Sequence, residues 1–144
     1  MNIQDFKKFF DSCEMDGDKI VISSNFKEAL KWVFDNYTYK MLKDITAVDK
    51  GNGEYELIYN LYSVDDEESV YLSTYVKDEA DSVTDLFKSA EADECEIYDM
   101  FGIKFIGNES LKRLYMPESW EGHPLRKDYV QADERLAWND ESET

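Results

Sequence analysis

The chain has 144 residues, of which 42% are apolar and 15% aromatic, and its formal net charge is −17. This length predicts one domain with a sizeable core, and the aromatic content excludes intrinsic disorder. Because so negative a chain repels phosphate groups and anionic lipids, the charge disfavours nucleic-acid binding and electrostatic attachment to membranes.

The two cysteines, Cys13 and Cys95, lie far apart, and neither belongs to a C-x-x-C pair or adjoins a histidine. The chain alone therefore offers no ligand set for an iron–sulfur cluster or a structural zinc. The N-terminus lacks the apolar segment of a signal peptide, and no apolar run approaches the ~18 residues of a membrane span. We expect a cytoplasmic chain with two free thiols. If the chain works at a membrane, other proteins must hold it there.

The N-terminal third predicts two helices and a strand. Apolar residues at helical spacing favour an amphipathic helix over residues 2–14, and a β-branched run favours a strand over residues 19–23. A second apolar stripe predicts a helix over residues 26–34. Asn25 and Glu28 have the spacing of a capping box at its start.

Three strands are predicted next, from alternating apolar residues and β-branched runs. They cover residues 41–48, 55–62 and 70–76, and turn signals at residues 50–53 and 65–69 join them. The simplest packing is a small antiparallel sheet with helices on one face. The predicted fold class is therefore α+β.

The C-terminal third differs from the rest in charge and in periodicity. A helix is predicted over residues 90–101 with Gly102 as its C-cap. Residues 103–130 then lose all periodicity and carry both prolines, and residues 104–130 hold five basic and four acidic side chains. We expect an α+β body over residues 1–102, an extended docking arm over 103–130 and an acidic tail over 131–144.

Three of the five carboxylates on the predicted third helix are candidates for a site: Glu94, Glu96 and Asp99. Glu94 falls on the apolar stripe, where a carboxylate needs a cationic partner or a proton. One interpretation is a carboxylate pair for acid–base chemistry or metal binding. The favoured interpretation is a buried or interfacial ion pair with one of the arginines that follow.

His123 is the only histidine and lies in the run Trp-Glu-Gly-His-Pro-Leu-Arg-Lys-Asp-Tyr, residues 120–129. With Glu121 or Asp128 it could act as a general base in a free-standing hydrolase or lyase. However, no serine or cysteine has a nucleophile motif, and no glycine-rich nucleotide motif is present. Tryptophan, tyrosine and arginine are typical of interface hot spots, so docking is the favoured role of this run. An acidic adaptor outside energy metabolism is a third hypothesis.

Residues 94–105, 111–114 and 120–129 together resemble one family signature. It is that of the 30-kilodalton (C) subunit of complex I-type NADH–quinone oxidoreductases and of the related membrane-bound Ech-type nickel–iron hydrogenases. The family pattern runs E-R-E-x-x-D-x-F-G-I-x-F, then Gly-His-Pro, L-x-R and W-E-G-x-P-L-R-K-D-Y. This chain departs from it at Ala92, at Cys95 in place of the arginine, and at residues 107–109 in place of Gly-His-Pro.

The resemblance implies a non-catalytic structural subunit of the peripheral arm of a membrane-associated oxidoreductase. Its partners would be the large subunit (49-kilodalton type, or hydrogenase type in the alternative Ech-like complex) and a cluster-bearing small subunit. This chain would hold no cofactor, since iron–sulfur clusters and any nickel–iron centre would lie in those partners. It would lie on the cytoplasmic side of the cell membrane as a peripheral subunit. No catalytic or metal-binding residue is expected, and the expected partner-binding residues are Glu94, Glu96, Asp99, Arg113, Trp120, His123, Pro124, Leu125, Arg126, Lys127, Asp128 and Tyr129.

Overall fold

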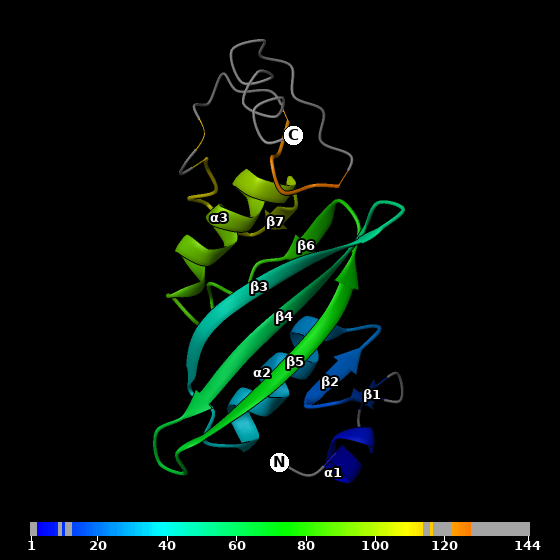
Figure 1. Cartoon of the computed structure of the whole chain (residues 1–144). Coiled ribbons are helices and arrows are strands. Elements are labelled where there is room, and N and C mark those ends of the chain that lie inside the picture. The colour runs from blue at the N-terminus through cyan, green and yellow to red at the C-terminus, as the bar shows by residue number, and fades with distance from the viewer. Residues whose placement is uncertain (1–2, 9, 11–12, 114–115, 117–121, 128–144) are drawn as a thin grey trace.

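A five-stranded mixed sheet in the order β1-β2-β5-β4-β3 organises the fold (Figure 1). The computed structural model describes residues 3–8, 10, 13–113, 116 and 122–127. Two longer helices pack on the sheet, and a second, two-stranded sheet lies beside it. The predicted α+β class is confirmed.

The three predicted strands form the antiparallel part of the sheet. They are β3 (Met41–Gly51), β4 (Glu54–Ser63) and β5 (Glu68–Val76), and β4 pairs with both neighbours. The turn between β3 and β4 places Gly51, Asn52 and Gly53 at positive φ, which explains the two glycines at that turn. The alternation in the sequence was therefore a sound guide to these strands.

The N-terminal region differs from its prediction. Helix α1 is short (Ile3–Lys7), and β1 (Cys13–Asp16) then forms a hairpin with β2 (Lys19–Ile22). The prediction of one helix over residues 2–14 is therefore wrong at its C-terminal end, where Cys13 and Glu14 belong to β1. Pairing with β2 satisfies the backbone groups that a longer helix would have satisfied. Since β2 also pairs in parallel with β5, the hairpin extends the sheet from three strands to five.

Helix α2 (Phe26–Asn36) begins where expected but without the predicted capping box. Asn25 has a left-handed backbone with φ 56°, and its side chain makes no capping hydrogen bond. A capping side chain requires an extended backbone to reach the first free N–H groups, and the left-handed conformation removes that geometry. The buried face of α2 packs on the sheet through Ala29, Leu30 and Val33.

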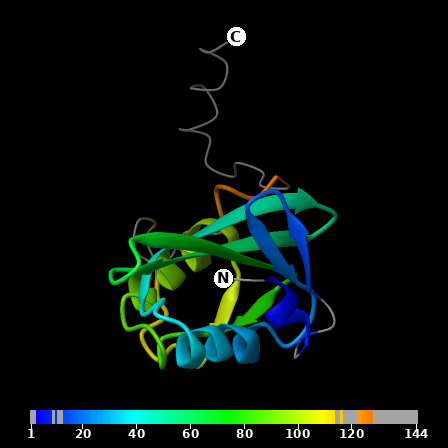
Figure 2. The same ribbon diagram turned by 90° about the horizontal axis from the view of Figure 1, so that it is seen from below.

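The core lies between one face of the sheet and the helices. Alternate residues of β4 point into it, namely Tyr55, Leu57, Tyr59 and Leu61, and all are at most 1% exposed. Figure 2 shows α2 and α3 (Ala90–Phe101) on the same side of the sheet. Helices on one face, as predicted, are therefore observed.

The residues directly after Gly102 belong to the second, two-stranded sheet. Strand β7 (Lys104–Ile106) pairs in parallel with β6 (Glu79–Asp81), which precedes α3 in the chain. A strand of three residues is too short to show periodicity, which explains why residues 103–130 were expected to be irregular throughout. Both cysteines are buried, and neither forms a disulfide within the described part of the chain. Within the described residues, no helix has the length and apolarity required to cross a membrane.

Glu56 is a buried carboxylate on the outer face of the sheet, where its side chain is 1% exposed. It accepts hydrogen bonds from Lys19 Nζ at 2.7 Å and Ser73 Oγ at 2.6 Å, and Lys50 Nζ lies 3.5 Å away. Burial alone would raise the pKa of Glu56, but these donors hold it below its usual value.

We expect the substitution Glu56→Gln to reduce the free energy of unfolding by about 1.5–3 kcal/mol at pH 7, because a charged acceptor is lost. A carboxylate with a lowered pKa contributes stability above its unfolded pKa, near 4.5, and that contribution disappears as the pH falls through the folded value. Urea unfolding from pH 7 to pH 3 should therefore show the two proteins converging. Glu54→Gln, on an exposed residue of the same strand, is the control, and a Glu56→Gln effect independent of pH would contradict the assignment.

Candidate functional site

Helix α3 positions the carboxylates that the sequence singled out. Glu94, Cys95, Ile97 and Asp99 are buried, and the helix ends at Gly102, whose N–H donates to the Tyr98 carbonyl at 2.8 Å. Gly102 has φ 81°, as expected of a C-cap glycine. The helix therefore buries more than one face, one against β3 and another against the loop that follows β7.

Glu94 is fully buried and is held by neutral donors. Oε1 accepts from Ser82 Oγ at 2.7 Å and from Asn108 Nδ2 at 3.0 Å, and Oε2 accepts from the Val83 N–H at 2.8 Å. Burial raises the pKa of Glu94, and the three donors oppose that rise only in part. The expectation of an arginine partner is therefore wrong for Glu94. Asn108 occupies the histidine position of the family triplet Gly-His-Pro.

Asp99 instead makes the ion pair that was predicted for this helix. Its carboxylate is fully buried, and Arg113 Nε lies 2.6 Å from Oδ1 with only 9% of the arginine side chain exposed. Oδ2 accepts from the Met116 N–H at 3.0 Å. Arg113 Nη2 donates to two carbonyls, that of Asp99 at 3.0 Å and that of Gly122 at 2.8 Å. One guanidinium thus joins the end of α3 to two later segments.

His123 lies against the C-terminal turn of α3. Its Nδ1–H donates to the Asp99 carbonyl at 2.8 Å, and its ring lies 5.8 Å from that of Tyr98, centroid to centroid. A β-carbon built on Gly102 would lie 2.6 Å from Cδ2 of His123, so only glycine leaves room for the ring. Glu121 and Asp128, the proposed partners of a general base, lie outside the described residues.

The segment after His123 follows the body rather than leaving it (orange in Figure 1). The Leu125 N–H donates to the Met100 carbonyl at 2.9 Å, and the Lys127 N–H donates to Asp49 Oδ2 at 2.7 Å. The bond from Lys127 and a second from the Gly51 N–H hold the pKa of Asp49 below its usual value. Arg126 lies over the ring of Tyr55, 5.5 Å from its centroid.

The hydrogen bonds of the Leu125 and Lys127 N–H groups fix this segment beside α3 and β3. We call the surface formed there the arm face and define it as Glu96, Met100, Leu125, Arg126 and Lys127. Leu125 is 57% exposed although it is apolar. Together with Ile45 and Met100 it lines a pocket of about 240 Å³, with Glu96 at the same pocket. Exposed apolar side chains between charged ones are typical of protein interfaces.

The expected partner-binding residues divide into those held within the chain, those at the surface and those outside the described residues. The first group bonds within the chain or is half-buried, and its members are Glu94, Asp99, Arg113, His123 and Pro124. The second group reaches the surface, and its members are Glu96, Leu125, Arg126 and Lys127. Trp120, Asp128 and Tyr129 lie outside the described residues. Sequence reasoning missed Asp49, Tyr55 and Asn108, because their contacts join residues far apart in the chain.

Comparison with known proteins identifies the family. The sequence model of the family described as "Respiratory-chain NADH dehydrogenase, 30 Kd subunit" matches residues 20–135. This chain belongs to that family. The NADH-quinone oxidoreductase C subunit of Citrifermentans bemidjiense is 38% identical over 114 residues, which cover 76% of this chain and 71% of that protein.

Two other similarities define the extent of this relationship. The NADH-quinone oxidoreductase C/D subunit of Phocaeicola vulgatus is 39% identical over 92 residues, 61% of this chain but only 18% of that longer protein. A chain from the structure of the membrane-bound sulfane sulfur reductase, described as an archaeal respiratory membrane complex, superposes with a TM-score of 0.75 at 23% identity, covering 97% of this chain and 88% of that one. The superposition shows a shared fold.

We expect Asp99→Asn to destabilise the protein by about 3–5 kcal/mol, because it leaves the Arg113 guanidinium buried without its counter-charge. Urea unfolding measures the loss, and hydrogen exchange at the Leu125 amide reports whether the arm segment detaches. Glu96→Gln, on the exposed side of the same helix, makes the same change in charge and should cost less than about 0.5 kcal/mol. Equal losses in the two variants would contradict the central role of the Asp99–Arg113 pair.

We expect Gly102→Ala to cost more than Gly53→Ala, although both glycines have positive φ. The backbone strain of alanine in this region is about 1–3 kcal/mol at either position. Only at Gly102 does the new methyl group also collide with the His123 ring, since nothing lies within 4 Å of a β-carbon at Gly53. Urea unfolding of both variants measures the difference, which the additional substitution His123→Ala should remove. A difference that persists in the double variant would disprove the collision.

Proposed function

We propose that this chain is a non-catalytic structural subunit of the peripheral arm of a complex I-related NADH–quinone oxidoreductase. The observation that carries the proposal is the folding of the family signature. Its described residues converge on the end of α3, where the Asp99–Arg113 pair and His123 hold the segment from Gly122 to Lys127 on the body. Such an arrangement is suited to presenting a rigid surface.

The arm face is the part of this surface that we propose docks on the large subunit. Leu125 offers an exposed apolar anchor, and Arg126 lies beside it in an otherwise acidic chain. Arginine and aromatic side chains carry much of the binding energy at protein interfaces. Trp120, Asp128 and Tyr129, which adjoin the arm face in sequence, belong to the same proposal.

The buried members of the predicted site have a different proposed role. Each of these residues makes its hydrogen bonds to other groups of this chain; they are Glu94, Asp99, Arg113 and His123. We therefore propose that they affect partner binding indirectly, by positioning the loops to which they bond. Glu96 and Lys127 are exposed and remain candidates for direct contact. This division separates residues that shape the arm face from residues that meet a partner.

The redox centres are proposed to lie in partner subunits, as iron–sulfur clusters in a small subunit next to the large one. We further propose that the chain is peripheral, on the cytoplasmic side of the cell membrane, and is held there by these partners. The named relatives favour a quinone-reducing complex over an Ech-type hydrogenase, because relatives that are 35–39% identical carry the name of the NADH-quinone oxidoreductase C subunit.

Co-purification tests the proposal. The full chain is expressed with the large subunit encoded in the same genome, and an affinity tag on the large subunit should recover both proteins in equal amounts. Failure of two folded proteins to associate would overturn the proposed docking. An isolated chain that turns over a substrate would overturn the proposed lack of catalysis.

We expect Arg126→Ala to weaken association with the large subunit by about 2–5 kcal/mol, the usual cost of removing one charge from a desolvated pair. Lys104→Ala is the control, because Lys104 is an exposed residue of β7 for which the structure records no ion pair among the described residues. Lys50 is less suitable, since it lies 3.5 Å from buried Glu56. Calorimetric titration of both variants measures the difference, and urea unfolding checks that each is folded. Equal affinities would exclude Arg126 from the interface.

A further inference from the structure

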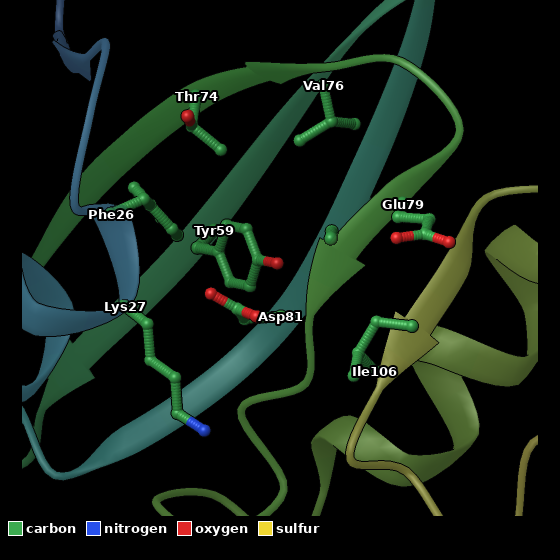
Figure 3. Close-up of a pocket in the computed structure, with 9 residues that line it drawn as sticks. Phe26, Lys27, Tyr59, Thr74, Val76, Glu79, Asp81 and Ile106 are labelled. Carbon is green, nitrogen blue, oxygen red and sulfur yellow. The ribbon is translucent and has the colours of Figure 1, made fainter.

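A second candidate binding site lies away from the arm face, on the side of the molecule formed by α2 and β6. It is a pocket of about 300 Å³ lined by residues of α2, β4, β5, β6 and β7 (Figure 3). None of its lining residues belongs to the arm face. Its size is at the lower end of the ~300–1,000 Å³ that small-molecule sites occupy, which suits a single side chain.

Tyr59 of β4 supplies the first indication of a ligand. Its side chain is 1% exposed, and its ring packs against that of Phe26 at a centroid distance of 4.8 Å. Figure 3 shows its hydroxyl group directed into the pocket. Within the described part of the chain no hydrogen bond of this hydroxyl is recorded, and its oxygen is not among the fully buried unpaired atoms, so it keeps contact with the open pocket. A phenol group with an apolar ring and an accessible polar end can bind a ligand that enters the pocket.

Two carboxylates on β6 supply the second indication. Glu79 and Asp81 are two residues apart on a strand, so their side chains lie on the same face, and both line the pocket. Neither has an ion-pair partner among the residues whose placement is described. Burial, the charge of Glu94 and the charge of Asp81 raise the pKa of Tyr59, so its hydroxyl stays neutral beside the carboxylates.

Among the described residues that line the pocket, Lys27 is the only cation, and it already has a counter-charge. Its Nζ lies 3.2 Å from Asp85 Oδ1, near the start of α2. The unbalanced charge in the pocket is therefore negative. Apolar walls from Phe26, Val76 and the half-exposed Ile106 complete the lining and match the methylene stem of a long basic side chain.

We propose that this pocket receives an arginine side chain of a partner subunit, with the guanidinium bound to Asp81, Glu79 and the hydroxyl oxygen of Tyr59. Arginine fits better than lysine, because its planar head carries five N–H donors for several separate acceptors. The proposal rests on the proposed function, which supplies the partner subunits. A protein side chain is favoured over a free cation because Glu79, Asp81 and Ile106 are exposed around the pocket, as at the polar rim of an interface.

The test begins with the full chain and two model compounds, N-acetyl-arginine methylamide and the uncharged isostere N-acetyl-citrulline methylamide. In NMR titrations the arginine compound should bind saturably and shift resonances of Tyr59 and Asp81, with the citrulline compound about tenfold weaker. Equal affinities, or no saturable binding of the arginine compound, would overturn the proposal.

Variants then assign the contacts. Asp81→Asn should weaken binding of the arginine compound about tenfold, and Tyr59→Phe about fivefold, since each removes one acceptor of a charge-assisted hydrogen bond. Lys27→Met should strengthen binding, because it removes a competing cation. Glu14→Gln, which makes the same change in charge on an exposed residue of β1 outside the pocket, should leave it unchanged. Binding that is insensitive to both Asp81→Asn and Tyr59→Phe would place the cation elsewhere and overturn the site.

The assembled complex decides the source of the arginine. Asp81→Asn should loosen association of the chain with its co-purified partner subunits at least about tenfold, the loss of one charge-assisted contact. If Arg126→Ala weakens assembly and Asp81→Asn does not, the docking function stands and the pocket proposal falls. If the wild-type chain does not associate with any partner, the proposed function falls, while saturable binding of the arginine compound would still support a cation-binding pocket without its partner.

Discussion

The structure at the end of α3 depends on one buried ion pair, Asp99 with Arg113. Taking both charges out of water is costly, and here the cost is offset because the polar atoms around them are satisfied. The Asp99 carboxylate binds Arg113 and the Met116 N–H, and its carbonyl binds Arg113 and His123. Because these bonds come from separate segments, one aspartate fixes how the loop after β7 and the segment around His123 meet the helix.

A second buried carboxylate on the same helix is stabilised by neutral hydrogen-bond donors and not by an ion pair. Glu94 forms no ion pair with any described residue and relies on a hydroxyl, an amide and a backbone N–H. Its pKa is raised, as expected when hydrogen bonds only partly replace hydration. Glu94 and Asp99 thus anchor different loops to α3. The two proposed partner surfaces, the arm face and the Tyr59 pocket, are both built on elements that these loops hold in place.

The sequence was a good guide wherever an element is long and amphipathic. Strands β3 to β5, helices α2 and α3, the C-cap Gly102 and an arginine partner for a carboxylate of α3 were all readable from local spacing. Apart from the capping box at Asn25, which the left-handed backbone removes, the failures share one cause. Strands β1 and β7 are too short to show an alternating pattern and form only by pairing with other strands. The donors to Glu94 come from residues before and after its helix, so no local spacing in the sequence indicates them.

The sequence by itself determined the α+β class, the family signature and the chemistry available in the C-terminal third, because each depends on residue types at short spacing. Only the tertiary structure decided which carboxylate meets which partner. It also decided that the Lys127 N–H reaches Asp49, and that the Tyr59 hydroxyl faces a pocket that two carboxylates of β6 also line. Those outcomes follow from the register of the sheet and from the way α3 packs on β3, and both bring together residues that are distant along the chain.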